Sequence, residues 1–283
     1  MNAQIINTII DAGVICTVSS ADNAKKMASA GVGALIADTA ELAKKIKAAL
    51  PSLAVGCKEI TAGVDFYLGE VFCEKCTARV RASGAPLVAV AKNAEEAKKM
   101  HGLGADVIAF VDADTNGGIA MLGAMSVAAP EAKFIVSGAS DGLSYTAIPA
   151  CIGWIDERVD SAEDISSAAS ETMYASLGLT LAHVGINAKS EAEAIEVSTA
   201  YSKLLGIKQK TGNSSCFAGS WVEVMKTPYL GDCGHIAIGT KSLPRAIAFY
   251  GRIGVEFNMD TAKPVAIYFK DDIGGFAIHL VQK

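Results

Sequence analysis

The chain has 283 residues, of which 51% are hydrophobic and 19% charged, and its formal net charge is −5. This length suits two domains of a compact α/β protein, and the negative net charge gives no indication of the basic face that nucleic-acid binding needs. The uncharged run of residues 115–130 is too short to span a bilayer, and no signal peptide opens the chain, so we expect a soluble, cytoplasmic protein.

Residues 1–160 alternate short apolar runs with segments rich in Ala, Lys and Glu, a pattern typical of parallel βα units. The expected strands are 13–19, 34–38, 53–58, 64–69, 86–91, 106–111, 133–138 and 151–156. Eight such strands predict a (β/α)8 barrel with functional groups at the carboxyl ends of the strands. Only about five residues separate the third and fourth strands, too few for a crossover helix. Either that helix has been lost or the barrel is distorted there.

One cysteine motif lies in this half of the chain. Cys73-Glu74-Lys75-Cys76 has the Cys-x-x-Cys spacing. No second pair at zinc-site spacing and no thioredoxin-like context accompany it, so the sequence favours a structural role for these two thiols.

The run from Gly104 to Asp114 resembles the sixth strand of the 2-keto-3-deoxy-6-phosphogluconate / 4-hydroxy-2-oxoglutarate (KDPG/KHG) aldolases. Other landmarks agree in order, namely Gly13-Val14-Ile15, Ala30-Gly31-Val32 and Ser83-Gly84-Ala85-Pro86. The resemblance covers most of residues 5–158. It implies a class I, Schiff-base aldolase barrel, and since such barrels are often trimers, it also implies a homo-oligomer.

Several positions depart from the aldolase pattern. The Schiff-base lysine of the family falls on Ala109 and its acid/base glutamate on Ile36, and an imine cannot form without an amine. The phosphate loop becomes residues 137–140 followed by Asp141, although a phosphate site needs free backbone N–H groups and positive potential. One interpretation is a barrel kept as a scaffold, oligomerisation unit or altered binding domain. The other makes Lys58, beside Glu59 at the barrel mouth, a relocated catalytic amine.

Residues 161–178 are expected to form the last barrel helix and a linker, and residues 179–283 contain an internal repeat. The run Ala182-His183-Val184-Gly185-Ile186 is echoed by Gly234-His235-Ile236-Ala237-Ile238, with the histidines 52 positions apart. Each copy predicts a strand, a helix and three further strands, a βαβββ module.

Four side chains of the repeat suit metal binding. His183, His235 and His279 each lie in an apolar strand with alternating pattern, so each points to a defined face. Glu223 lies in a similar strand, where a charge is costly unless it is paired or bound to a metal. Three imidazoles and one carboxylate can ligate Zn²⁺, Ni²⁺, Co²⁺, Mn²⁺ or Fe²⁺.

Residues from about 179 to 283 resemble the glyoxalase I and extradiol dioxygenase (vicinal-oxygen-chelate, VOC) superfamily, whose metal ligands lie on the first and last strands of each βαβββ module. Carried over, these ligands are His183 and Glu223 in the first module and His235 and His279 in the second. His279 stands where glyoxalases usually carry glutamate.

Three functions follow as hypotheses. The favoured one is metal-dependent polarisation of a small oxo or hydroxy-acid substrate, of lyase or isomerase type, in the C-terminal domain. The second is a KDPG/KHG-type carbon–carbon lyase that works by a modified mechanism. The third is a non-catalytic small-molecule binding protein. In each case the expected ligand is an oxo acid or oxo aldehyde, and neither nucleic acid nor a membrane is an expected partner.

Overall fold

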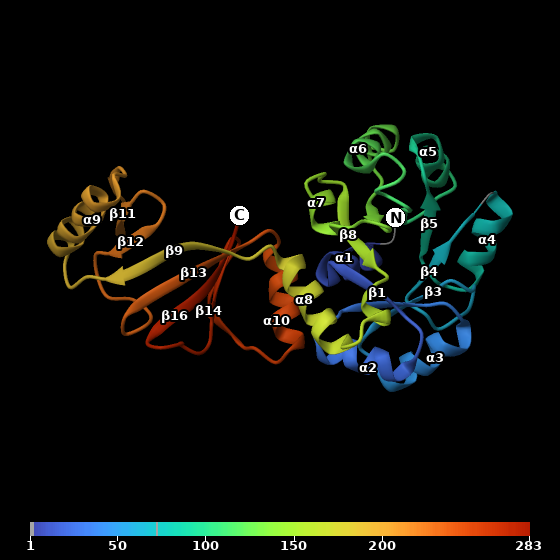
Figure 1. Ribbon diagram of the computed structural model, residues 1–283, viewed down its shortest axis with the longest axis horizontal. Helices are drawn as coiled ribbons and strands as arrows, with labels where there is room; N and C mark the ends of the chain where they lie inside the picture. Colours follow the sequence, from blue (N-terminus) through green and yellow to red (C-terminus); the bar gives the residue numbers. More distant parts are fainter. Residues whose placement is uncertain (1–2, 72) are drawn as a thin grey trace. The chain divides into compact units, whose positions relative to one another are not determined.

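The computed structural model describes residues 3–71 and 73–283. The chain divides into two compact units, Met1–Ser176 and Leu177–Lys283, and each unit is built on its own β-sheet (Figure 1). The first sheet is a closed parallel barrel and the second is an eight-stranded mixed sheet, which confirms the predicted α/β architecture. Among the described residues, no helix is both long and apolar enough to cross a membrane.

The barrel closes in sequence order, with β8 returning to pair with β1. Its strands are β1 (Val14–Val18), β2 (Ala34–Ala37), β3 (Ala54–Cys57), β4 (Phe66–Gly69), β5 (Leu87–Ala91), β6 (Val107–Phe110), β7 (Phe134–Val136) and β8 (Cys151–Asp156). Its helices are α1 (Ala3–Ala12), α2 (Ala21–Ser29), α3 (Ala40–Ala49), α4 (Glu74–Ala82), α5 (Ala94–Gly102), α6 (Gly118–Ala128), α7 (Gly142–Tyr145) and α8 (Ile165–Leu177), with a 3₁₀ turn at Val159–Ser161.

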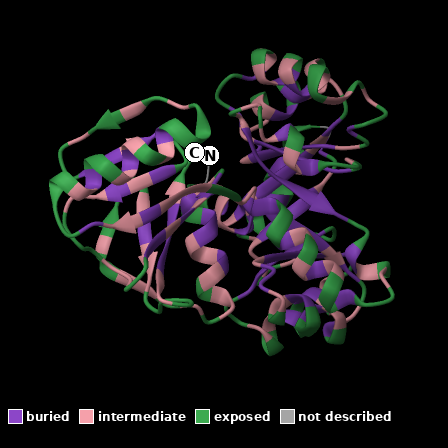
Figure 2. Ribbon diagram, turned by 60° about the vertical axis from the view of Figure 1, so that its left-hand side comes forward, coloured by how far each residue is buried: buried purple, intermediate pink, exposed green. Residues whose placement is uncertain are grey.

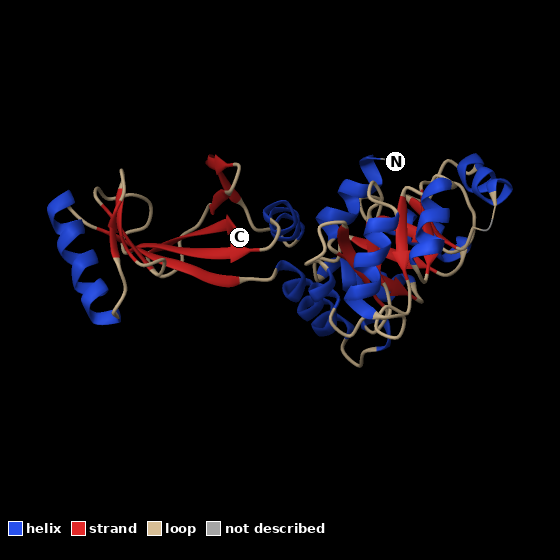
Figure 3. Cartoon of the chain, turned by 90° about the horizontal axis from the view of Figure 1, so that it is seen from above, coloured by secondary structure: helices blue, strands red, loops and turns tan. Residues whose placement is uncertain are grey.

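The barrel strands are buried on both faces, and the helices surround them (Figures 2 and 3). This double burial explains why the strands are continuous apolar runs instead of alternating ones. Inward-facing side chains such as Ile36, Phe66 and Ile135 fill the centre, so the barrel is a packed core. Helix α1 precedes the first strand and adds Ile5 and Ile9 to the same cluster.

The connection between β3 and β4 has no helix, which is one of the two alternatives that the short spacing left open. Residues 58–65, all described by the structure, form bends and turns, yet β3 and β4 still pair in parallel. An extended chain of this length reaches about 25 Å, enough to return along two short strands without a crossover helix. The barrel is therefore closed although one of its helices is missing.

The C-terminal unit contains the two predicted βαβββ modules. The first is β9 (Thr180–Asn187), α9 (Glu191–Leu205), β10 (Gln209–Thr211), β11 (Ser215–Ala218) and β12 (Val222–Met225). The second is β13 (Gly234–Thr240), α10 (Leu243–Arg252), β14 (Phe257–Lys263), β15 (Ala266–Phe269) and β16 (Phe276–Gln282). Ser190 and Ser242, also 52 positions apart, cap α9 and α10 by accepting hydrogen bonds from Glu193 N and Arg245 N.

The two modules join through their first strands. The strand order is β10-β11-β12-β9-β13-β16-β15-β14, with β9 and β13 antiparallel at the centre. In each module the first strand pairs in parallel with the last, β9 with β12 and β13 with β16. Helix α9 covers one face of the first module, where Val222 and Val224 pack with Ala194. The four central strands thus leave their other face for the polar side chains described next.

Candidate functional site

The four side chains that the sequence singled out in the repeat come together on the central strands. His183 lies on β9, Glu223 on β12, His235 on β13 and His279 on β16. In the strand register, Ala237 lies opposite both His183 and His279, and Gly185 lies opposite both Glu223 and His235. Because strand side chains alternate between faces, this register puts all four on one face.

The donor atoms of these side chains lie at short distances. Nε2 of His183 is 3.2 Å from Nε2 of His235 and 3.1 Å from Oε2 of Glu223. The same carboxylate oxygen is 3.3 Å from Nε2 of His235. Donor nitrogens of all three histidines lie within 4.8 Å of one another. Ligands that share a metal at bond lengths of about 2.0–2.2 Å lie about 3–3.5 Å apart, so the three histidines could hold a divalent transition metal, with Glu223 beside His183 and His235.

Glycine at position 185 makes this approach possible. A β-carbon there would lie 2.0 Å from Cε1 of His235, far inside van der Waals contact. The imidazole of His235 therefore occupies the space that a side chain on β9 would fill. Its ring is only 2% exposed and so has one defined position.

Electrostatics favour an ionised Glu223 carboxylate and a neutral His279 imidazole. Burial opposes ionisation of Glu223, but hydrogen bonds from His183, His235 and Ser215 hold the pKa of this carboxyl well below its usual range. The Ser215 hydroxyl donates to Oε1 of Glu223 at 2.6 Å and leaves Oε2 for the histidines. Burial, and then the charges of His235 and His183, lower the pKa of His279 to about 4. A neutral imidazole is the form that binds a metal.

Three buried ring nitrogens at this site have no hydrogen-bond partner among the described residues. They are Nδ1 of His235 and both Nδ1 and Nε2 of His279. The imidazole of His279 stacks on Tyr268, with ring centroids 4.5 Å apart. Buried polar atoms without partners are rare in folded proteins, and a metal bound between the rings would satisfy those that face it.

A cavity of about 390 Å³ opens at this cluster. Besides Glu223, His235 and His279, it is lined by Ser214, Met225, Thr227, Tyr229, Thr261, Lys263, Ala266 and Tyr268. The lining contains several hydroxyl groups and one cation, the ammonium of Lys263, and this combination suits a small polar anion. We did not predict Tyr268 or Lys263 as site residues, although Tyr268 lies opposite His279 in the register of β15 and β16.

The barrel mouth contains a second cavity, of about 330 Å³. Lys58 lines it together with Thr17, Tyr67, Glu70, Ser137, Glu157 and several apolar side chains. Nζ of Lys58 is paired with Oδ1 of Asp38 at 2.7 Å. The neighbouring Glu59 has a different position, since its Oε2 accepts a hydrogen bond from Ala40 N at the start of α3. Ala109, at the position where the aldolases carry their lysine, is fully buried in the barrel core.

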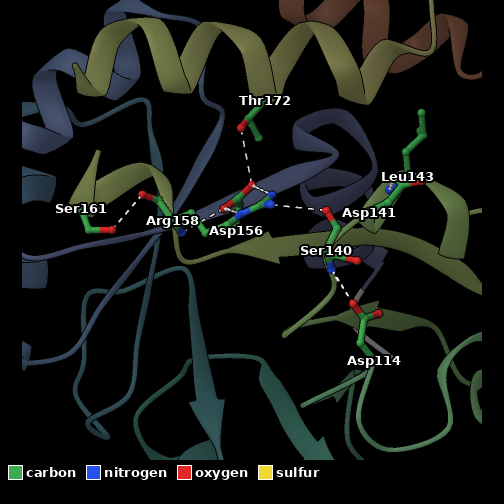
Figure 4. A network of polar contacts seen from close by, with 8 residues as sticks. All are labelled: Asp114, Ser140, Asp141, Leu143, Asp156, Arg158, Ser161 and Thr172. Carbon is green, nitrogen blue, oxygen red and sulfur yellow. Dashed lines mark hydrogen bonds and ion pairs between the residues drawn. The ribbon is translucent and has the colours of Figure 1, made fainter. Parts of the chain in front are cut away.

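The loop that resembles a phosphate site is occupied by the protein's own carboxylates (Figure 4). Oδ2 of Asp114 accepts from Ser140 N at 2.8 Å, and Oδ1 of Asp141 accepts from Leu143 N at 3.1 Å. The nearby Arg158 is held by Asp156, whose Oδ2 lies 2.7 Å from Nη2. A carboxylate thus occupies the N–H of Ser140, and the charge of Arg158 is paired with Asp156, although a phosphate site needs free N–H groups and unpaired positive charge.

Comparison with solved structures relates the barrel to aldolases by fold. The 2-keto-3-deoxy-6-phosphogluconate aldolase of Zymomonas mobilis ATCC 29191 matches at 20% identity and a TM-score of 0.50, over 58% of this chain and 93% of its own. The KDPG aldolase of Legionella pneumophila, solved with pyruvate captured as a covalent carbinolamine intermediate, matches at 18% identity and a TM-score of 0.51, over 59% and 95%. The matched share corresponds in length to the unit that holds the barrel.

A third structure shows how little the fold says about activity. The thiamine phosphate pyrophosphorylase of Pyrococcus furiosus matches at 14% identity and a TM-score of 0.52, over 59% of this chain and 96% of its own. At such identities the likeness concerns the fold alone, and one fold serves many reactions. No protein-family model matches the chain, and a search of curated proteins also gave no match.

Proposed function

We propose that the C-terminal unit binds one divalent transition metal and acts on a small oxo or hydroxy acid, in a reaction of lyase or isomerase type. The observation that carries the proposal is the convergence of one carboxylate and three imidazoles, with donor distances of 3.1–3.3 Å around Glu223 and the first two histidines. These distances suit a shared ion.

The arrangement of the modules supports a relationship to the glyoxalase/VOC superfamily. Two βαβββ modules join through β9 and β13, and each module contributes one candidate ligand from its first strand and one from its last. This is the ligand pattern that the sequence resemblance implies. With Glu223 and three histidines as ligands, a five- or six-coordinate ion keeps open positions for substrate oxygens.

When bound, the metal would supply Lewis-acid polarisation of substrate oxygens. The protein's own groups have separate roles around it. Ser215 fixes the orientation of the Glu223 carboxylate. Lys263 gives the cavity a positive charge that suits a substrate carboxylate, and Tyr229 and Tyr268 present phenol groups to the same space. The stack of Tyr268 on His279 restricts this ring to one orientation.

The test is the metal content of full-length protein, measured by mass spectrometry after reconstitution with Zn²⁺, Ni²⁺, Mn²⁺ and Fe²⁺. About one metal per chain is expected in the wild type, as in other metalloproteins with one such site. His235→Ala and His279→Ala should lose it. His101→Ala is the matched control, because His101 lies on α5 of the barrel. Absence of metal from the reconstituted wild type would overturn the proposal.

The barrel suggests a second candidate, a 2-keto acid aldolase with Lys58 as the amine. Its support is the fold likeness to KDPG aldolases and the place of Lys58 in the mouth cavity. An ammonium paired with Asp38 at 2.7 Å is a poor nucleophile, and Ala109 supplies no amine. Treatment with pyruvate and borohydride decides the matter. A mass increase on Lys58 that is absent from Lys58→Arg would favour the aldolase function. An unmodified chain would rule that function out.

A further inference from the structure

The cysteines of the Cys-x-x-Cys motif lie against each other at the start of α4. Sγ of Cys73 is 3.4 Å from Sγ of Cys76, and neither cysteine forms a disulfide. Cys73 is exposed and Cys76 is partly buried, whereas Cys16, Cys57, Cys151 and Cys216 are all buried. A sulfur–sulfur contact with one sulfur open to solvent is the geometry from which a disulfide forms with little movement.

Cys73 also occupies an N-cap position, where several other helices of this chain have a capping side chain. The side chains that accept a hydrogen bond at the starts of α2, α3, α5, α9 and α10 belong to Ser20, Thr39, Asn93, Ser190 and Ser242. At α4 the N-cap residue is Cys73, and its side chain makes no capping hydrogen bond. Lack of a cap costs a helix about 1 kcal/mol, and here the sulfur contacts Cys76 instead.

The backbone holds this pair in place. The carbonyl of Cys73 accepts hydrogen bonds from Cys76 N at 3.1 Å and from Thr77 N at 3.2 Å, which closes the first turn of α4. Because α4 follows β4, this turn lies at the carboxyl ends of the barrel strands, as does the mouth cavity. Burial, and then the charge of Cys76, raise the pKa of Tyr67, which lines this cavity.

A metal site at the two thiols would need further ligands, and the described residues supply none in range. Among the described residues, the one cluster of three or more His, Cys, Asp or Glu side chains with ligand atoms in range is that of His183, His235 and His279. Two cysteines alone make half of a structural zinc site. The pair therefore has the geometry for redox chemistry, and the described part of the chain adds no further metal ligands to it.

We propose that Cys73 and Cys76 are a thiol–disulfide exchange site that reacts with small-molecule disulfides of the glutathione type. The exposed Cys73 sulfur attacks the disulfide, forms a mixed disulfide and releases one small thiol. Cys76 then attacks the Cys73 sulfur and releases the second small thiol. The protein loses two electrons and two protons, and the disulfide is reduced to two thiols. The sulfurs must close from 3.4 Å to about 2.05 Å.

The test equilibrates full-length protein in glutathione buffers with an increasing oxidised fraction and then blocks free thiols by alkylation. Trypsin cleaves after Lys75, between the two cysteines. An internal disulfide therefore appears as two linked tryptic peptides, and the intact mass falls by two hydrogen atoms. Because the second step is intramolecular, we expect Cys76→Ser to stop at a glutathione adduct on Cys73 and to need an oxidised fraction at least about tenfold higher.

Cys233→Ser is the matched control, because Cys233 is exposed but lies in the C-terminal unit. This variant should form the linked peptides as the wild type does. The proposal is overturned if Cys73 and Cys76 remain separately alkylated at every buffer ratio while Cys233 takes up glutathione. It is also overturned if the wild type accumulates the adduct on Cys73 without the linked peptides. Neither result depends on metal binding by the C-terminal unit.

Discussion

Replacing Gly185 with alanine tests whether the close approach of β9 to His235 builds the candidate metal site. The new β-carbon would lie 2.0 Å from Cε1, 2.2 Å from Nδ1 and 2.3 Å from Nε2 of the imidazole. Non-bonded atoms prefer about 3.5–4.0 Å, so the ring must move by about 1.5 Å. It has little room to do so, because it is 2% exposed and its Nε2 lies 3.2 Å from Nε2 of His183.

The expected effects concern stability and metal affinity separately. Overpacking of this kind lowers the free energy of unfolding by about 1–3 kcal/mol, which scanning calorimetry measures as a lower Tm. Loss of an ordered ligand position weakens metal binding by about 10- to 100-fold. Competition for Zn²⁺ with a chromophoric chelator measures this affinity on the full-length protein.

Gly251→Ala is the matched control in the same unit. Gly251 lies in α10, and a β-carbon there has no atom within 4 Å. Alanine in a helix should therefore stabilise the protein by about 0.4–1 kcal/mol and leave zinc affinity unchanged. If Gly185→Ala binds Zn²⁺ and unfolds like the wild type, the packing of His235 against β9 is refuted as the basis of the site.

Three further predictions concern polar contacts of both units. Ser215→Ala removes the 2.6 Å hydrogen bond to Glu223 and should weaken Zn²⁺ binding by about tenfold in the same competition assay; unchanged affinity would contradict the orienting role. Burial opposes ionisation of Asp156, but Arg158 holds the pKa of this carboxyl below its usual range. The resulting stabilisation is present above the ordinary carboxyl pKa of about 4 and is lost as the pH falls through the lowered value. Asp156→Asn should therefore cost about 1–2 kcal/mol in urea unfolding at neutral pH and much less in strong acid, and an equal cost at both would count against the ion pair. Inorganic phosphate should not raise the wild-type Tm, because Asp114 already occupies the N–H of Ser140, and a phosphate-dependent rise would show that this loop remains a phosphate site.

Periodicity made the architecture readable from the sequence. Eight apolar runs at βα spacing predicted the barrel, and the short spacing before residue 64 left a missing helix as one of two alternatives. In the repeat, alternation along the strands fixed the face on which His183 and His235 point, and their spacing of 52 identified equivalent strands. These features depend on local pattern, which a single sequence contains.

Contacts between distant loops could not be predicted from the sequence pattern. Glu59 was expected beside Lys58 at the mouth, and the sequence did not show that its carboxylate accepts a hydrogen bond from Ala40 N at the start of α3. The hydrogen bond from Ser140 N to Asp114 joins two different βα loops. Such contacts depend on how loop backbones approach each other after the barrel closes. The approach of Cys73 to Cys76 likewise depends on the extended backbone of Cys73, with φ −161° and ψ 168°, which the Cys-x-x-Cys spacing does not specify.

The join between β9 and β13 gives the C-terminal unit an internal two-fold axis. Val184 pairs with Ile236, its own equivalent in the repeat, so the axis passes through this pair. Rotation about the axis exchanges His183 with His235. It also exchanges Glu223, opposite Gly185, with His279, opposite Ala237.

The four candidate ligands thus obey the symmetry in position but break it in charge. One half of the site carries a carboxylate and the other half an imidazole. The duplicated modules therefore place equivalent side chains around the cavity but give its two halves different charge.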